Sequence, residues 1–310
     1  MSTSDIDMRD AFFDEIYEIG SKDKDVVFLT DDMDAFSLRR FKADMPNQFI
    51  NINVAEQNMI NVAAGLAIYG KKVFTYGIAS FVTMRSLEQI KVNLCSMNLP
   101  VTIIGVGPGF SFEFDGPTHH GTQDVAIMRA IPEITIYNLS DISLAARAAH
   151  LAYRSNGPVY VRLDKGKFPI LSDAIESFSD GFRILKPLGE VNIVSTGFMT
   201  SQALEVAAEL EKRSVHVGLV DLYRLKPIDN AFFHKVLEPS AEIVTLEESS
   251  FVGGIGSIVC EILADKGSDV RVRRFAIHDR QFISYGSRGW FHAQNGLDVA
   301  SVVEALTKRS

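Results

Sequence analysis

Short runs of β-branched and aliphatic residues alternate with segments of helical periodicity along almost the whole chain. Strands are predicted at residues 26–30, 49–52, 73–76, 101–106, 134–137, 159–163, 191–195, 215–222, 243–246 and 270–275. Between them, apolar residues recur at the spacing of one helix face, as in Met59, Ile60, Ala63 and Leu66. Strands that alternate with helices are typical of right-handed βαβ units in a parallel sheet covered on both faces. The chain is therefore predicted to be an α/β protein.

A segment rich in proline, glycine, serine and aspartate interrupts this alternation between Gly166 and Gly189. Such composition is typical of a linker between domains. Beyond it the alternation resumes, with helices expected at residues 201–212, 230–237, 255–264 and from 298 onward. We therefore predict a parallel-sheet α/β domain over residues 1–170, a linker over 171–188 and a smaller α/β domain over 189–310.

Composition excludes several classes of protein. Lys and Arg number 31 against 39 Asp and Glu, a net charge of −8, whereas binding to a nucleic-acid backbone depends on clustered positive charge. The two cysteines, Cys95 and Cys260, lie far apart and outside any Cys-X-X-Cys motif, so neither a disulfide scaffold nor a zinc module is expected. The acidic N-terminal residues do not resemble a secretory signal, and no apolar run approaches the roughly 20 residues of a membrane span. We expect a cytoplasmic protein that binds neither nucleic acid nor a membrane.

Open parallel sheets bind ligands beyond the carboxyl ends of their strands, so the candidate site follows Ile52, Tyr76 and Val106. After the first of these positions, Glu56 opens a predicted helix. An acid in the first helical turn is commonly stabilised by the helix dipole alone. The alternative is a carboxylate at the base of a cleft, where it holds a proton and hydrogen-bonds a heterocycle. At the second position, Tyr76 and Phe81 are either core aromatics or a stacking platform for a planar ring.

A loop rich in glycine and proline follows the third position and carries Asp115, His119 and His120. Because histidine has the proton affinity closest to neutral pH, this loop holds the best acid–base cluster of the chain. The alternative is a surface loop with an incidental histidine pair. No third His or Cys lies at ligand spacing, so no metal is expected there. Lys165, in a group of cations after a later strand, is either solvated or bound to a phosphate or carboxylate.

One further glycine-rich segment, Gly253-Gly-Ile-Gly256, precedes a predicted helix in the second half. Such a segment can cradle an anion at the N-terminus of a helix. Its spacing differs from the dinucleotide fingerprint, so tight packing of the helix is the favoured interpretation.

Four motifs in order resemble the transketolase family of thiamine-diphosphate enzymes. They are Asn53-Val-Ala-Glu56-Gln, Asp115-Gly-Pro-Thr-His119 followed by His120-Gly, the stretch from Ile131 to Asp141, and the segment from Glu247 to Gly256. Each motif is modest alone, but four of them in order at family spacing are specific. The resemblance covers nearly the whole chain and implies the family's pyrimidine-binding domain followed by its C-terminal domain.

The resemblance assigns roles around the cofactor. Glu56 matches the family glutamate that hydrogen-bonds the ring nitrogen of the aminopyrimidine and so takes part in catalysis. Phe81 matches the aromatic that stacks on the pyrimidine, and Ile52 and Tyr76 are expected to be further cofactor contacts.

It also assigns roles around the substrate. Asp115 and His119 match the family's contacts to substrate hydroxyl groups, with His119 expected to be catalytic and His120 beside it. Lys165 stands where many members place an arginine for the substrate phosphate, and it keeps the charge without the bidentate fork.

Two departures from the family pattern narrow these expectations. The segment from Gly107 to Phe114 lacks the histidine that sugar-phosphate transketolases carry there, so the substrates need not be the usual pentose phosphates. The chain also lacks the Gly-Asp-Gly motif with which the family binds the diphosphate and its Mg²⁺. The resemblance therefore implies a beta-type half-enzyme without metal ligands of its own. An N-terminal transketolase subunit would hold the diphosphate and Mg²⁺, with two copies of each chain in a heterotetramer.

The activity implied is that of the C-terminal subunit of a split transketolase. It would move a two-carbon ketol unit from a ketose or ketose phosphate to an aldehyde. Alternatives with the same cofactor are a synthase of the 1-deoxyketose phosphate type and the β subunit of a 2-oxo-acid dehydrogenase. An alternative of another class is a non-catalytic assembly or regulatory subunit.

Overall fold

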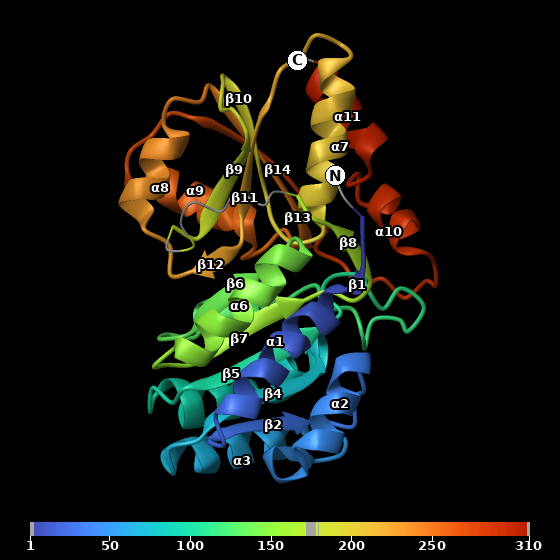
Figure 1. Cartoon of the computed structure of the whole chain (residues 1–310). Helices are drawn as coiled ribbons and strands as arrows, with labels where there is room; N and C mark the ends of the chain where they lie inside the picture. Colours follow the sequence, from blue (N-terminus) through green and yellow to red (C-terminus); the bar gives the residue numbers. More distant parts are fainter. Residues whose placement is uncertain (1–2, 172–177, 179, 309–310) are drawn as a thin grey trace.

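The computed structural model describes residues 3–171, 178 and 180–308, which form two α/β bodies packed against each other (Figure 1). The larger sheet of these residues has seven strands. In spatial order they are β12 (Arg224–Lys226), β6 (Thr135–Asn138), β7 (Val159–Leu163), β5 (Val101–Val106), β4 (Lys72–Ile78), β2 (Val26–Thr30) and β3 (Phe49–Asn51). All neighbouring pairs are parallel except β12 with β6. The predicted α/β class with mostly parallel sheets is confirmed.

Helices cover both faces of this sheet, because apolar residues point to both sides of its buried parallel strands. One face packs against α1 (Met8–Lys22), α2 (Phe36–Asp44) and α6 (Ile142–Arg154). The other packs against α3 (Glu56–Ile68), the π-helical turn η3 (Ile90–Cys95) and α5 (Asp124–Ala130). Shorter helical segments are η1 (Pro46–Gln48), the π-helical turn η2 (Phe81–Arg85) and α4 (Leu87–Gln89).

The second body is built on a five-stranded sheet in the described part of the chain. Its spatial order is β14 (Arg271–Ile277), β13 (Glu242–Ser250), β10 (Val191–Ser195), β11 (Gly218–Leu222) and β9 (Phe182–Lys186). One face packs against α7 (Met199–Glu211), α10 (Arg288–Gln294) and α11 (Val299–Thr307). The other packs against α8 (Asn230–Leu237) and α9 (Ile255–Asp265), whose apolar residues share one core with the first body. A two-stranded antiparallel sheet pairs β1 (Thr3–Asp7) with β8 (Lys167–Pro169).

Two short strands depart from the predicted division of the chain. The expected linker, residues 171–188, contains β9, which pairs antiparallel with β11 and so belongs to the second sheet. Strand β12 comes from the second half of the chain but pairs antiparallel with β6, at the edge of the first sheet. Most of the remaining linker lies outside the described residues. Short edge strands carry little periodicity of their own, which is why the sequence pattern did not reveal them.

A buried ionic network fastens the two bodies together. Arg183 on β9 donates from Nη2 to Asp141 at 2.8 Å and from Nε to Asp221 at 2.9 Å. Asp141 caps α6 of the first body, whereas Asp221 lies on β11 of the second. Both carboxylates have 0% exposure, and Arg183 has 7%. Each carboxylate is therefore compensated by a cation that spans the junction.

We expect Arg183→Met to lower the free energy of unfolding by about 3–5 kcal/mol, because two buried carboxylates then lose their shared cation. Urea unfolding of the isolated chain measures this change. Arg213→Met removes an exposed arginine after α7 and serves as the control. A loss of less than about 1 kcal/mol would show that Arg183 behaves as a surface charge.

Candidate active site

The carboxyl edge of the larger sheet brings together three positions distant in sequence. Asp31 follows β2, Glu56 is the first residue of α3 after β3, and Gly77 lies near the end of β4. The parallel register of β2 with β3 and β4 places these ends side by side. A Cβ atom on Gly77 would lie 2.1 Å from Oδ2 of Asp31, so only glycine allows the carboxyl group this close approach.

The Glu56 carboxylate is buried at this edge, with 1% of the residue exposed. Arg85 of η2 donates from Nη1 to both of its oxygens, at 2.9 and 2.8 Å. The same guanidinium lies 4.7 Å from the ring centroid of Phe81, so Arg85 contacts both residues expected to bind the pyrimidine. Glu56 thus lies at the N-terminus of its own helix and pairs with one partly exposed cation.

Asp31 is a candidate site residue that the sequence analysis missed. It is 6% exposed, and its Oδ1 atom has no hydrogen-bond partner. Burial, followed by the neighbouring charge of Glu56, raises the pKa of Asp31 to about 7. A carboxyl group that titrates near neutrality beside a second carboxylate is typical of a functional site. Its position after a buried strand was the available signal, although the acidic run around it resembles a solvated loop.

The structure brings the predicted aromatic and one predicted histidine together. The rings of Phe81 and His119 have centroids 5.0 Å apart, and Phe112 lies 5.8 Å from His119 on another side. Ser80 donates to the backbone oxygen of Thr118 at 2.9 Å, which ties the histidine loop to the start of η2. The cofactor-contacting and substrate-contacting segments expected from the sequence are therefore adjacent.

The two histidines of this loop face different surroundings. His119 is half-buried next to Phe81, whereas His120 is 4% exposed and packs edge-on against both Phe110 and Phe291. Burial is the largest cause that lowers the pKa of His120, which favours the neutral ring. The expectation that His120 contacts substrate beside His119 is therefore corrected: His120 belongs to the packing beneath the loop. Neighbouring residues of an irregular loop point in different directions, which sequence adjacency does not reveal.

Tyr76 is also corrected. It is fully buried within the core beneath α1, in edge contact with Phe13 at 4.9 Å, and its hydroxyl lies beside Arg9. The structure thus favours the core interpretation over a cofactor contact. Ile52 is half-buried at the carboxyl edge and packs against the apolar core, so its role as a cofactor contact stays a prediction.

The remaining substrate candidates lie near the same loop. Asp115 is exposed. Lys165 follows β7, and its Nζ atom lies 3.9 Å from the ring centroid of Phe112, the residue that also contacts His119. One cation is thus available beside the loop, and its partner in a substrate stays a prediction.

The backbone N–H groups at the start of α9 are hydrogen-bonded by a carboxyl group of the protein itself. Glu247 accepts hydrogen bonds from the backbone nitrogens of Ile255 at 2.7 Å and Gly256 at 2.8 Å. A Cβ atom on Gly254 would lie 2.0 Å from Oε2 of Glu247. The favoured interpretation, tight packing at the start of the helix, is confirmed.

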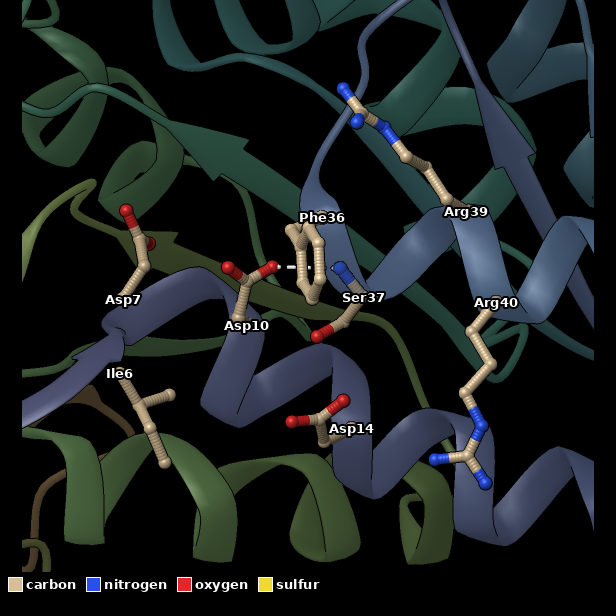
Figure 2. Close-up of a pocket in the computed structure, with 8 residues that line it drawn as sticks. All are labelled: Ile6, Asp7, Asp10, Asp14, Phe36, Ser37, Arg39 and Arg40. Carbon is tan, nitrogen blue, oxygen red and sulfur yellow. Dashed lines mark hydrogen bonds between the residues drawn. The ribbon is translucent and has the colours of Figure 1, made fainter.

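A cavity of about 510 Å³ lies between α1 and α2 (Figure 2). Its walls carry Ile6, Asp7, Asp10, Asp14, Phe36, Ser37, Arg39 and Arg40, and Asp10 accepts a hydrogen bond from the Ser37 backbone. These residues include none of the predicted site residues, so this cavity is separate from the candidate site. Within the described ranges, no group of three or more His, Cys, Asp or Glu residues is arranged to hold a metal ion. In the same part of the chain, no helix has the length and apolarity needed to cross a membrane.

Comparisons with known proteins fit this geometry. Residues 4–170 match the model of the transketolase pyrimidine-binding domain, and residues 181–302 match that of the transketolase C-terminal domain. The 6-deoxy-6-sulfo-D-fructose transketolase subunit SqwH of Clostridium sp. (strain MSTE9) is 33% identical over 96% of this chain and 92% of that protein. An apulose-4-phosphate transketolase subunit of Phocaeicola vulgatus is 32% identical over 96% of both chains. The 1-deoxy-D-xylulose-5-phosphate synthase of Clostridium tetani is 29% identical over 96% of this chain and 48% of that longer protein.

Solved structures match over almost the full length. A structure described as a split gene transketolase, inactive beta4 tetramer, superposes with a TM-score of 0.87 at 31% identity and covers 98% of both chains. A transketolase from Pichia stipitis superposes with a TM-score of 0.83 at 19% identity over 99% of this chain and 46% of that one, which is a likeness of fold.

We expect Asp31→Asn to raise the free energy of unfolding at about pH 8 by about 2–4 kcal/mol, because the folded wild-type protein then carries a buried carboxylate with one oxygen that lacks a hydrogen-bond partner. The folded-state pKa of about 7 lies above the usual value, so the gain shrinks as the pH falls and the carboxyl group regains its proton. Urea unfolding at several pH values measures this. Asp269→Asn, at an exposed position, is the control. An equal gain at acidic and alkaline pH would contradict the assignment.

Proposed function

Because the chain belongs to the transketolase family, we propose that it works as the C-terminal subunit of a split transketolase that uses thiamine diphosphate. In the proposed reaction, a two-carbon ketol unit passes from a ketose to an aldehyde. The observation that carries this proposal is the buried Glu56 carboxylate, which is linked through Arg85 to Phe81, whose ring lies 5.0 Å from that of His119. An acid, a flat apolar face and an ionisable group are thereby gathered at one edge of the sheet.

The residues present fit the pyrimidine end of the cofactor. Glu56 offers a water-excluded carboxylate that can share a proton with a ring nitrogen, and Phe81 offers a surface for stacking. Asp31 adds a buried carboxyl oxygen without a partner at the same edge. When bound, thiamine diphosphate supplies the carbanion stabilisation that cleavage of a carbon–carbon bond beside a carbonyl requires.

Arg85 regulates access to this carboxylate in the proposal. Its guanidinium donates to both oxygens of Glu56 and covers Phe81, so it occupies the approach to both groups. A ring nitrogen that approaches Glu56 must either bind the lone pairs of the carboxylate that Arg85 leaves unused or displace Arg85. Because 46% of the Arg85 side chain is exposed, this displacement has a path into solvent.

On the substrate side, His119 and Asp115 would orient hydroxyl groups next to the reacting carbons. His119 already has Thr118 Oγ1 at 2.9 Å from Nδ1, so its Nε2 atom is the one free to exchange a proton with a substrate hydroxyl. Lys165 would attract an anionic group at the far end of the ketose. The names of two relatives specify a sulfonated or phosphorylated sugar, which suits such a cation.

The diphosphate and Mg²⁺ are proposed to lie on a partner subunit. The sequence has no Gly-Asp-Gly motif, and the described residues offer no cluster of acidic or histidine ligands. Two of the relatives are named as subunits of a transketolase. The solved relative composed of beta chains alone is described as inactive, which agrees with a need for the partner. We propose two copies of each chain in the working enzyme, with the cofactor shared across the interface.

A synthase of 1-deoxyketose phosphates is a second candidate, favoured by the 29% identical synthase from Clostridium tetani. The two reactions differ in their donor. A synthase takes a 2-oxo acid and releases CO₂, whereas a transketolase takes a ketose and releases a shorter aldose. Assays of the complex with each donor therefore separate the two.

We expect Glu56→Gln to lower ketol transfer by about 100-fold or more, because the amide cannot exchange a proton with the cofactor ring. The assay uses the chain co-expressed with its diphosphate-domain partner, with thiamine diphosphate and Mg²⁺ added. Glu205→Gln, on an exposed surface of α7, is the control. Retention of full activity by Glu56→Gln would exclude the proposed role.

We expect Lys165→Met to raise the KM of a phosphorylated or sulfonated ketose by about tenfold, since one charge-assisted contact to the anion is lost. The KM of the corresponding neutral ketose should not change. Steady-state kinetics with both substrates measure the difference. If both KM values rise equally, Lys165 acts through the packing of Phe112 and not through the anion.

A further inference from the structure

The loop that carries Asp115 and His119 is anchored outside its own domain. We call residues 107–121, between β5 and α5, the substrate loop. Its Phe110 is 0% exposed and belongs to the apolar core of the second body. The ring stacks on Phe291 of α10 with centroids 4.5 Å apart and meets Phe282 edge-on at 5.2 Å. Phe110 is therefore a structural anchor that fixes the loop to the second body.

A second anchor is the guanidinium of Arg288, at the start of α10. Its Nη2 atom donates to Oδ2 of Asp164 at 2.6 Å, and its Nε atom donates to Oε1 of Glu248 at 2.9 Å. The guanidinium also lies 3.7 Å from the ring centroid of Phe198. In this position 14% of the Arg288 side chain is exposed. One cation of the second body thus pairs with a carboxylate at the end of β7, in the first body.

The backbone and the side chain of Arg288 are both connected to the substrate loop. Asp164, held by the guanidinium, accepts a hydrogen bond through its other oxygen from Ser111 Oγ at 2.7 Å. The backbone N–H of Arg288 donates to the side-chain carboxylate of Glu113. Asp164 also immediately precedes Lys165, the predicted anion contact. Arg288 therefore holds the substrate loop at Glu113 directly and at Ser111 through Asp164. It also holds Asp164 itself, the residue next to Lys165.

The charges of this network require Arg288 to stay in place. Asp164 is 1% exposed and Glu248 is 3% exposed. Burial by itself would raise the pKa of Glu248, but the neighbouring Arg288 and His292 hold it well below its usual range. Without Arg288, the two buried carboxylates would lose the cation that they share, so displacing the arginine would cost substantial free energy.

The backbone of the substrate loop does not fix its own course. Gly107, Gly109 and Gly116 all have positive φ values, at 80°, 57° and 77°. A Cβ atom on Gly109 would lie 2.4 Å from Cδ of Glu248, so the loop presses directly on β13 of the second body. Glycines permit this course but do not enforce it, since they adopt many conformations at similar energy.

We propose that Arg288 is a positioning residue of the active site, through which the C-terminal domain sets the place of the substrate loop. Arg288 acts through Glu113 and Asp164 and does not itself touch the substrate. The inference rests on the proposed function in one respect, that Asp115 and His119 on this loop contact the substrate. It gives the C-terminal domain a definite part in a reaction whose other groups lie on the first body.

Two variants test the proposal without leaving a buried charge unpaired. Glu113→Ala removes the half-buried carboxylate that accepts from the Arg288 backbone, and Arg288→Lys keeps the cation but loses the fork that joins Asp164 to Glu248. Arg271→Ala is the matched control, because this exposed arginine of β14 pairs with Glu242 of its own domain at 3.7 Å.

Hydrogen–deuterium exchange of the isolated chain is the first measurement. Both variants should exchange about tenfold faster or more at the amides of residues 109–121, while Arg271→Ala matches the wild type. Unchanged exchange in both variants would overturn the proposal, whatever the enzyme does. This readout needs neither substrate nor partner, so it tests the anchoring even if the proposed activity is wrong.

Kinetics of the complete complex are the second measurement. A misplaced loop should raise the KM of the ketose about tenfold or more, with a smaller change in kcat and a half-saturating thiamine diphosphate concentration within about twofold of wild type. Faster exchange without any change in KM would overturn the positioning role. Absence of ketol transfer in the wild-type complex would instead refute the proposed function, and the exchange result would still stand.

Discussion

Buried arginine–carboxylate pairs hold the two α/β bodies in a fixed relation, and the candidate site depends on that relation. Arg183 spans the junction on one side, and Arg288 spans it beside the substrate loop. Arg162 adds a third bridge, since it pairs with Asp124 at 2.8 Å and donates to the backbone oxygens of both Gly121 and Glu248. Because an unpaired buried charge costs several kcal/mol, each bridge resists separation of the bodies. The loop of the first body is therefore shaped by the second.

The charged groups at the carboxyl edge of the first sheet lie within one body and are less completely paired than those at the junction. Glu56 is paired directly with Arg85, which is partly exposed, whereas Asp31 has no ion pair of its own among the described residues and has a pKa raised to about 7. The structure thus places a partly exposed cation and a carboxyl group that titrates near neutrality at the same edge. Such an arrangement suits a site where a proton must be held beside a planar ring.

This chain supplies half of the proposed cofactor site. Glu56 and Phe81 fit the aminopyrimidine, whereas the described residues hold no cluster for a metal-bound diphosphate. In the full-length relatives the corresponding region makes up 45–48% of the chain, which leaves the other part to supply what is lacking here. The proposed split enzyme divides the cofactor site between two polypeptides, and within this chain the C-terminal domain contacts the substrate loop through Arg288.

The sequence by itself determined the layers of the fold, the strand ends at which the site lies, and the position of Glu56 at the start of a helix. These features are local: periodicity and strand boundaries are written in consecutive residues. Only the tertiary structure decided that Tyr76 faces the core and that Asp31 is buried. A parallel strand covered on both faces is apolar throughout, so its sequence does not tell which side chain faces which layer. The sequence also did not reveal that Arg288 holds the substrate loop. That role depends on pairing with the buried Asp164 and Glu248, which lie 124 and 40 residues away in sequence.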